Sequence, residues 1–215
     1  MTPRPPRPGK TRLRRDEILD EATRLFAERG YEGTSMADLA ERVGLRKASL
    51  FHHFASKEVL YASVLERLVQ AVGAAMMKAA VQTGSFTERL DNLSDGITIA
   101  LGEQPFAARL LIREVMDWGP VVRDTLAQTM MTVLEAADQF VKGGQAEGVF
   151  VDTDSKQLII TVAGVHFMPF AIGGIVQRFI GTDPADPEFV EARRKVVRDH
   201  IRHLVLVKKP KSAKG

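Results

Sequence analysis

The sequence predicts an all-α protein in which a small N-terminal unit of three helices precedes a larger helical domain. Apolar residues recur at the i, i+3, i+4 spacing of a buried helix face. No stretch alternates polar and apolar residues between hairpin turns, as a half-buried strand would. A composition of 45% hydrophobic and 27% charged residues is ordinary for a globular protein and too apolar for a disordered one.

Glycines and prolines gather at joints that divide the 215 residues into about nine helices. Gly30 suits the left-handed residue that ends a helix. Ser35 with Asp38, and Ser85 with Glu88, form patterns typical of the capping box that opens a helix. The expected helices cover residues 11–28, 36–43, 47–53, 57–81, 85–101, 105–117, 120–145, 154–180 and 187–207.

The chain divides into four expected parts. Residues 1–10 form a flexible, proline-rich basic arm that lacks the apolar stretch of a secretory signal. Residues 11–60 form the three-helix unit, residues 61–207 the larger domain, and residues 208–215 a lysine-rich tail. The boundary between the two helical parts falls inside the expected helix 57–81, so they share an element instead of a linker.

The positive charge of the chain is concentrated at its ends. Residues 1–15 carry six basic side chains and residues 208–215 carry four, with no acid in either segment, so residues 16–207 have a net charge of −7. Overall basicity is therefore weak support for a nucleic-acid partner, and such a partner must be argued from a local site.

No catalytic motif stands out in the sequence. The absence of cysteine excludes disulfides, thiolate metal sites and cysteine nucleophiles, and no glycine-rich phosphate loop, G-x-S-x-G or H-E-x-x-H motif occurs. His52 and His53 are adjacent and therefore point about 100° apart on a helix. His200 and His203 have a metal-compatible spacing but no accompanying carboxylates, so solvent-facing roles are favoured. We expect neither an enzyme nor a bound metal or cofactor.

Residues 34–58 have the spacing of a helix-turn-helix, two short helices joined by a turn that contains Gly44. Apolar positions 39, 43, 45, 50 and 54 are spaced to fill one small core. This arrangement leaves Lys47, Ser49, His52 and His53 near the outer surface of a short helix that can enter a major groove about 12 Å wide. From spacing alone, a buried corner of two helices with solvated side chains is a serious alternative.

From Arg15 to Leu60 the sequence resembles the DNA-binding domain of TetR-family transcriptional regulators. The match needs no gaps, and the total length also agrees with the family. The residues that carry the resemblance are Phe26, Gly30, Tyr31, Thr34, Ser35, Leu39, Ala40, Gly44, Leu50, Phe51, His52, His53, Phe54, Ser56, Lys57 and Glu58. The resemblance makes the corner alternative unattractive.

The resemblance implies a set of DNA-contacting positions, with Thr34 and Ser35 binding phosphate at a helix N-terminus and Lys57 anchoring another phosphate. Bases would be approached from the start of the third helix, and the backbone from its later residues. The expected DNA contacts are Thr34, Ser35, Arg46, Lys47, Ala48, Ser49, Phe51, His52, His53 and Lys57. The basic arm could also lie on DNA, in a minor groove, although a solvated tail is an equally good interpretation.

Three positions depart from the family pattern. Arg46 stands where serine or threonine is common, which removes an N-cap hydroxyl worth about 1 kcal/mol. Ala48 replaces a common glycine and adds a methyl group that could touch a thymine methyl. Phe51 replaces a tyrosine and cannot donate a hydroxyl to phosphate. We expect the charge of Arg46 to replace part of that backbone affinity.

The resemblance also implies homodimers that pair through the last two helices, about 155–181 and 187–207. Residues 158–176 contain no Asp, Glu, Lys or Arg, and a helix that is apolar all round must be buried. A second copy of the chain would cover it, although its 19 residues also approach the length of a membrane span. Pro169 should kink this helix.

A ligand cavity in the larger domain is the second implication. Large soft side chains on helices around its centre suit an adaptable apolar pocket, although such residues more often serve as ordinary core. Arg113 and His166 are polar exceptions that could receive a carboxylate or a hydroxyl. The expected ligand-binding residues are Phe106, Leu110, Arg113, Met116, Trp118, Met130, His166, Phe167 and Phe170.

Together these features predict a cytoplasmic, sequence-specific regulator of transcription that binds a palindromic operator in double-stranded DNA as a homodimer. Repression is the commoner behaviour of proteins with this resemblance, and release by a small hydrophobic effector is expected. The alternative is a helix-turn-helix protein that binds DNA architecturally or under the control of another protein, without a small-molecule gate.

Overall fold

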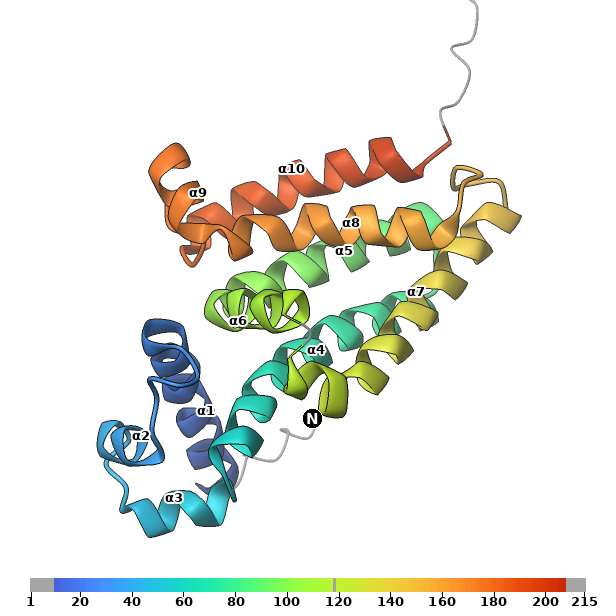
Figure 1. Ribbon diagram of the computed structural model, residues 1–215. Helices are drawn as coiled ribbons and strands as arrows, with labels where there is room; N and C mark the ends of the chain where they lie inside the picture. The colour runs from blue at the N-terminus through green and yellow to red at the C-terminus, as the bar shows by residue number, and fades with distance from the viewer. Residues whose placement is uncertain (1–9, 118, 208–215) are drawn as a thin grey trace, which may run out of the picture.

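In the computed structural model, which describes residues 10–117 and 119–207, ten α-helices and one π-helical turn account for the regular structure, and those residues contain no strand (Figure 1). The all-α prediction is therefore confirmed. The elements are α1 (Lys10–Arg29), α2 (Met36–Arg42), α3 (Lys47–His53), α4 (Lys57–Val81), α5 (Phe86–Glu103), α6 (Pro105–Met116), η1 (Val122–Leu126), α7 (Ala127–Ala146), α8 (Ser155–Ala171), α9 (Gly173–Ile180) and α10 (Pro187–Val205). The expected arm and tail lie outside the described residues except for Lys10, which begins α1 instead of ending the arm.

Local start and stop signals place the early helices where the sequence predicts them. Gly30 has φ 74° and Gly44 has φ 62°, the left-handed conformation that glycine adopts without steric cost. Ser35 accepts a hydrogen bond from the amide of Asp38, and Ser85 forms a complete capping box with Glu88. These caps satisfy N–H groups that have no partner within the first turn of a helix.

The expected helix over residues 154–180 is instead two helices, α8 and α9, which bend by 76° at Ile172. Gly173 and Gly174 follow the break, and two successive glycines make helix continuation costly in backbone entropy. The prediction of about nine helices is thus one too few, and the sharp bend falls three residues after Pro169.

Pro169 itself lies inside α8, where its ring removes one backbone hydrogen bond. The carbonyl of Val165, which would have accepted that bond, accepts one from the guanidinium of Arg193 at 2.7 Å. Arg193 belongs to α10, so the missing bond inside α8 is replaced by a bond between the two helices.

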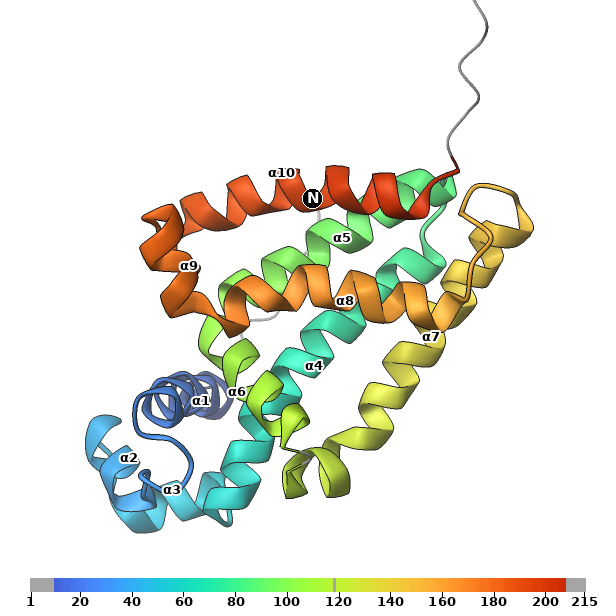
Figure 2. The ribbon, with the colours of Figure 1, turned by 45° about the horizontal axis from the view of Figure 1, so that its top comes forward.

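Helix α4 connects the three-helix unit to the rest of the molecule (Figure 2). It packs against α1 at one end and against α5, α6 and α7 along its length. One continuous apolar cluster joins Phe26 and Leu50 of the small unit to Leu110 of α6 and Phe170 of α8. A second cluster fills the far end of the larger domain, around Phe140, Phe150 and Val197. The small unit therefore rests on the larger domain through a shared core.

Two segments of the described residues have the length and composition of a membrane span. One is α4, and the other is the bent pair α8–α9. Helix α4 is a central helix with neighbours on several sides, which explains its apolar character without a membrane. The pair α8–α9 is broken by its 76° bend.

Candidate nucleic-acid interface and buried cavity

Helix α3 presents its outer face to solvent at the end of the molecule opposite α10 (Figure 1). Lys47, Ala48, Phe51 and His52 are exposed, whereas Leu50 on the opposite face is fully buried. Ser49 and His53 are half-buried at the margins of the exposed face. The short helix thus offers one row of small, aromatic and basic side chains to a partner.

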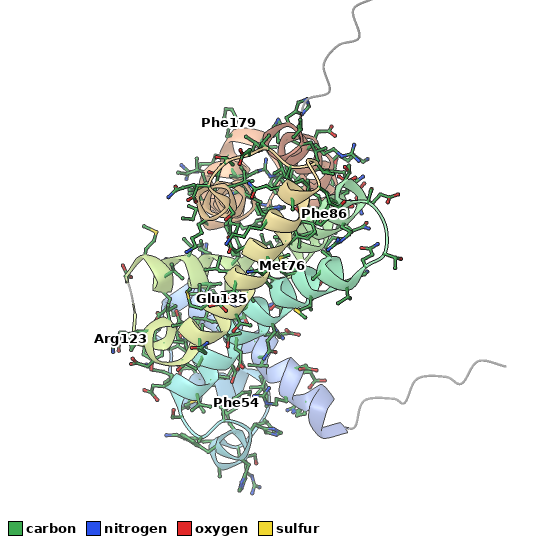
Figure 3. All side chains as sticks on the ribbon, turned by 90° about the vertical axis from the view of Figure 1, so that its right-hand side faces the viewer. Phe54, Met76, Phe86, Arg123, Glu135 and Phe179 are labelled. Atoms are coloured by element: carbon green, nitrogen blue, oxygen red, sulfur yellow. The ribbon has the colours of Figure 1, made fainter. Side chains whose placement is uncertain are left out.

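The buried side of α3 is fixed by a small apolar core. Phe26, Leu39, Leu50 and Phe54 are all fully buried there, and the guanidinium of Arg15 lies 4.7 Å from the centroid of the Phe54 ring. Figure 3 shows Phe54 at one end of the molecule and Phe179 at the other. This core sets the angle at which α3 projects from α1 and α4.

The N-terminus of α3 has no side-chain cap. Arg46 occupies the N-cap position in extended conformation and makes no capping hydrogen bond, as its departure from the family pattern predicts. The side chain is exposed instead, which places a cation beside the uncapped N–H groups of the first turn.

Thr34 and Ser35, expected to share one role, have different environments. The Thr34 side chain is buried, and its hydroxyl donates to the carbonyl oxygen of Gly30 at 2.8 Å. This arrangement argues against a direct contact between that hydroxyl and phosphate. Thr34 instead stabilises the turn between α1 and α2. Ser35 is exposed at the N-cap of α2, where its Oγ accepts from the Asp38 amide at 3.1 Å.

Lys57 is held against the same turn. Its Nζ donates to the carbonyl oxygen of Tyr31 at 3.1 Å and lies 4.1 Å from the centroid of the Tyr31 ring. The Tyr31 hydroxyl donates to Glu58 at 2.9 Å, and burial together with this carboxylate raises the pKa of Tyr31 above its ordinary value. An ammonium has three N–H donors. The Tyr31 carbonyl accepts one of them, so Lys57 is held in place with further donors for a partner.

A cavity of about 750 Å³ lies among α4, α5, α6, α7 and α8, within the size range of small-molecule sites. Its walls are almost entirely apolar. The expected residues that line it are Arg113, Met116, Met130, His166 and Phe167. Figure 3 marks Met76 of α4, which lines the cavity as well.

Three of the expected ligand-binding residues lie elsewhere. Phe106 is 41% exposed on α6. Leu110 is buried in the core shared with the small unit. Phe170 is buried against the ring of Phe189 of α10, at 6.1 Å between centroids. None of the three lines the cavity, because each points to another side of its helix. Trp118 lies outside the described residues.

Arg109 is a cavity residue that the sequence-based interpretation missed. Its spacing of four residues from Arg113 was a usable signal, since residues i and i+4 share a helix face. Arg113 itself is exposed, as are Met116 and Asp117 beside it. The charged residues that line the cavity all come from α6 and its C-cap, toward the solvent side.

His166 is the buried polar residue of the cavity wall, with 2% of its surface exposed. Burial, reinforced by the charge of Arg193, lowers the pKa of His166 to about 4, so the ring is neutral at pH 7. Its Nδ1 lies 3.2 Å from the hydroxyl oxygen of Thr98, and its Nε2 has no hydrogen-bond partner within the described structure. No group of three or more His, Asp or Glu side chains within residues 10–117 and 119–207 could hold a metal ion.

Comparison with known proteins identifies the class of this fold. A family model described as bacterial regulatory proteins of the tetR family matches residues 18–64. A second, described as a tetracyclin repressor-like C-terminal domain, matches residues 87–201, which is more than half of the chain. The chain belongs to the TetR family.

Individual TetR-family relatives agree with this assignment. IcaR of Staphylococcus aureus (strain Newman), a negative transcriptional regulator of a biofilm operon, is 49% identical over 47 residues, which cover 22% of this chain and 25% of IcaR. The chain thus spans about a quarter of IcaR's length. RutR of Escherichia coli O157:H7 is 27% identical over 162 residues, covering 72% of this chain and 73% of RutR. The crystal structure of PfmR from Thermus thermophilus superimposes with a TM-score of 0.69 at 25% identity, over 86% of this chain and 98% of that one.

In this TetR-family protein, one contact ties the cavity wall to the helix-turn-helix unit, and another ties α4 to α6. The guanidinium of Arg109 on α6 donates to the carbonyl oxygen of Ala27 at 3.1 Å, where α1 leaves its last carbonyls without helical partners. The hydroxyl of Tyr61 on α4 donates to Glu114 of α6 at 3.5 Å. Burial and this carboxylate raise the pKa of Tyr61 to about 12, so the phenol keeps its proton as a donor.

Proposed function

We propose that this protein is a cytoplasmic transcriptional repressor that binds a palindromic operator as a homodimer and is released from it by a small, largely apolar effector. The observation that carries the proposal is the solvent-facing row of α3, set by a buried core within a TetR-family helix-turn-helix unit. The name of IcaR as a negative regulator favours repression.

The DNA-binding half of the proposal assigns roles by position on the surface. Lys47, Ala48 and Ser49 approach base edges in the major groove, where lysine can meet guanine and serine can bond several bases. Arg46, Phe51 and His52 lie along the phosphate backbone. Ser35 and Lys57 contact phosphates on either side, from the starts of α2 and α4.

The homodimer half rests on an exposed apolar face of α8. Ile160, Gly164 and Met168 recur at spacings of four residues and are all exposed, so they share one side of the helix. Gly164 and Met168 also line the cavity, whereas Ile160 does not. A side chain added at Gly164 would meet no atom of the same chain within 4 Å. Val196 and Leu204 of α10 are also exposed apolar side chains. Exposed apolar surface of this kind marks protein contacts, and an isologous pairing would cover it with its copy.

Replacing Ile160 by arginine tests this surface. The Ile160 side chain is 64% exposed and does not line the cavity, so the variant fits the isolated chain but places a charge in the proposed interface. We expect a shift from dimer to monomer in sedimentation velocity, with unchanged helix content. Gln128→Arg, an exposed change on α7, is the matched control and should stay dimeric. A dimeric Ile160→Arg variant would contradict this interface.

The effector half is supported by the cavity. A helix-turn-helix protein without a small-molecule gate would be expected to have a solid second domain, whereas this one has about 750 Å³ of apolar space. A ligand that binds one arrangement of α6 better than another shifts the equilibrium between the two. The bond from Arg109 to Ala27 then couples the position of α6 to that of α1. In the dimer, the two α3 helices no longer keep the separation of about 34–36 Å, or a multiple, that binding to both half-sites requires.

The DNA-binding half is tested with single alanine variants measured against one set of duplexes that differ by single base pairs. Ser49→Ala should alter preference at one position of the site, and Lys47→Ala should relax preference at the position where it meets guanine. Lys156→Ala, an exposed lysine at the start of α8, is the control and should bind as the wild type does. Equal affinities for all three variants would contradict the assignment of α3.

A further inference from the structure

The cavity has few polar lining residues, and one of them is buried. The lining residues are apolar except for Arg109, Arg113 and Asp117, which belong to α6 and its C-cap and are at least partly exposed, and His166, which is buried on α8. Nε2 of His166 has no hydrogen-bond partner within the described structure. Buried polar atoms are paired in the great majority of cases, so an unpaired nitrogen on a residue in the wall of a ligand-sized cavity points to a ligand group that reaches it when the wall side chains shift.

The neighbours of His166 decide whether Nε2 donates or accepts. The Thr98 hydroxyl donates its single proton to the carbonyl oxygen of Ser94 at 3.0 Å. The 3.2 Å contact between Thr98 and Nδ1 is then satisfied only if Nδ1 carries the proton and Thr98 accepts it. In the neutral ring, Nε2 is therefore left with a lone pair, as a hydrogen-bond acceptor.

We propose that the cavity takes an uncharged, largely apolar molecule with one hydroxyl or N–H donor, which it places on Nε2 of His166. This inference rests on the proposed function, because it names the class of effector that the cavity admits. The apolar walls bind the body of the molecule, and His166 selects the one polar group.

A carboxylate is disfavoured at this position. It would set its oxygens against the Nε2 lone pair unless the ring gained a proton, and a protonated ring would lie buried beside the positive charge of Arg193. Arg193 already donates to Val165 and lies outside the lining residues. The cationic side chains of the lining, Arg109 and Arg113, lie on α6, whereas His166 lies on α8. They therefore do not change the argument at the position of His166.

The test uses three probes of one shape, 4-octylphenol, 4-octylanisole and 4-octylbenzoate, titrated calorimetrically into the full-length protein. The phenol should bind about tenfold more tightly than its methyl ether, which is about 1.4 kcal/mol, and more tightly than the benzoate. In His166→Leu this preference should fall to about one. His166→Gln keeps an acceptor oxygen and should restore part of the preference. Nitrogen-15 NMR of the wild type should show an unprotonated Nε2.

Each outcome decides the matter. If the phenol and the ether bind equally to the wild type, or if the benzoate binds best, the proposed role of His166 is wrong while the apolar effector cavity stands. If no probe binds and none alters DNA affinity, the effector half of the proposed function fails together with this inference. If His166→Leu does not fold, the wild-type ratio and the protonation of Nε2 give the answer without it.

Discussion

The guanidinium of Arg109 and the carbonyl oxygen of Ala27 share a hydrogen bond of 3.1 Å. One partner lines the cavity of the larger domain, and the other lies in the last turn of α1, whose apolar face packs on the helix-turn-helix. A single bond thus connects the wall that a ligand would touch to the helix that supports α3.

Replacing Arg109 by glutamine should weaken the coupling between the two sites. We expect operator affinity without ligand to change little, because one hydrogen bond contributes about 1 kcal/mol to stability. Release by a saturating cavity ligand should become several-fold weaker, since coupling energies of about 1–3 kcal/mol are usual. The measurement is operator affinity with and without ligand. Arg123→Gln, an exposed change on η1 outside the cavity lining, is the control. An Arg109→Gln variant that is released as fully as this control would count against the route.

Replacing Arg46 by serine should separate stability from DNA affinity. A serine N-cap satisfies an N–H group of α3 and should raise the free energy of unfolding by about 1 kcal/mol. Loss of the exposed cation should weaken DNA binding for all sequences and lower the salt slope by about one. Urea unfolding and salt-dependent anisotropy measure the two effects. An unchanged salt slope would show that Arg46 does not contact phosphate.

Arg193 and Pro169 should be energetically coupled. Arg193→Met removes the donor to Val165 and should cost about 1–3 kcal/mol of unfolding free energy, because a carbonyl is left without its partner. In a Pro169→Ala background the helix supplies its own donor, so the same change should cost less. A double-mutant cycle at fixed protein concentration measures the difference. Additive effects would mean that Arg193 acts independently of the proline.

His166 should make stability depend on pH. Its pKa is about 4 in the folded state and near 6.5 in an unfolded chain. Between these values the unfolded state binds the proton more readily, so stability is lost as the pH falls from about 6.5 to 4, by ~3 kcal/mol in total. His166→Gln lacks this group and serves as the reference, because carboxylates that titrate in the same range affect both proteins. Parallel stability curves for the two would exclude a buried neutral histidine.

Local patterns predicted the helix-turn-helix and its supports well. The bounds of α3 and α4 agree with the sequence, because Gly44, Ser56 and the apolar spacing are local signals. The environment of Thr34 did not follow from its position beside Ser35, since one of two neighbouring hydroxyls turns into the core at the α1–α2 turn. Nor did the local pattern predict that the 154–180 segment would bend at Ile172 and not at Pro169.

The cavity was harder to predict than the fold. Which side of α6 faces it depends on how α4, α5, α7 and α8 surround that helix, and this arrangement is not encoded by the spacing within α6 alone. Phe106 and Leu110 were therefore chosen for their size, whereas Arg109 was missed although Arg113, one turn further along α6, was named. His166 was identified because a lone histidine in an apolar helix is conspicuous, but its accepting nitrogen required the position of Thr98.

Selection of bound duplexes from a random DNA library, repeated at several salt concentrations, tests the central claim most directly. The account predicts enrichment of a two-fold symmetric sequence whose half-sites lie one helical turn or a multiple apart, with binding that weakens steadily as salt rises. Enrichment should be lost when Ser49 and Lys47 are both replaced by alanine. Failure to enrich any sequence, or enrichment that survives the double replacement, would contradict the reading of DNA by α3.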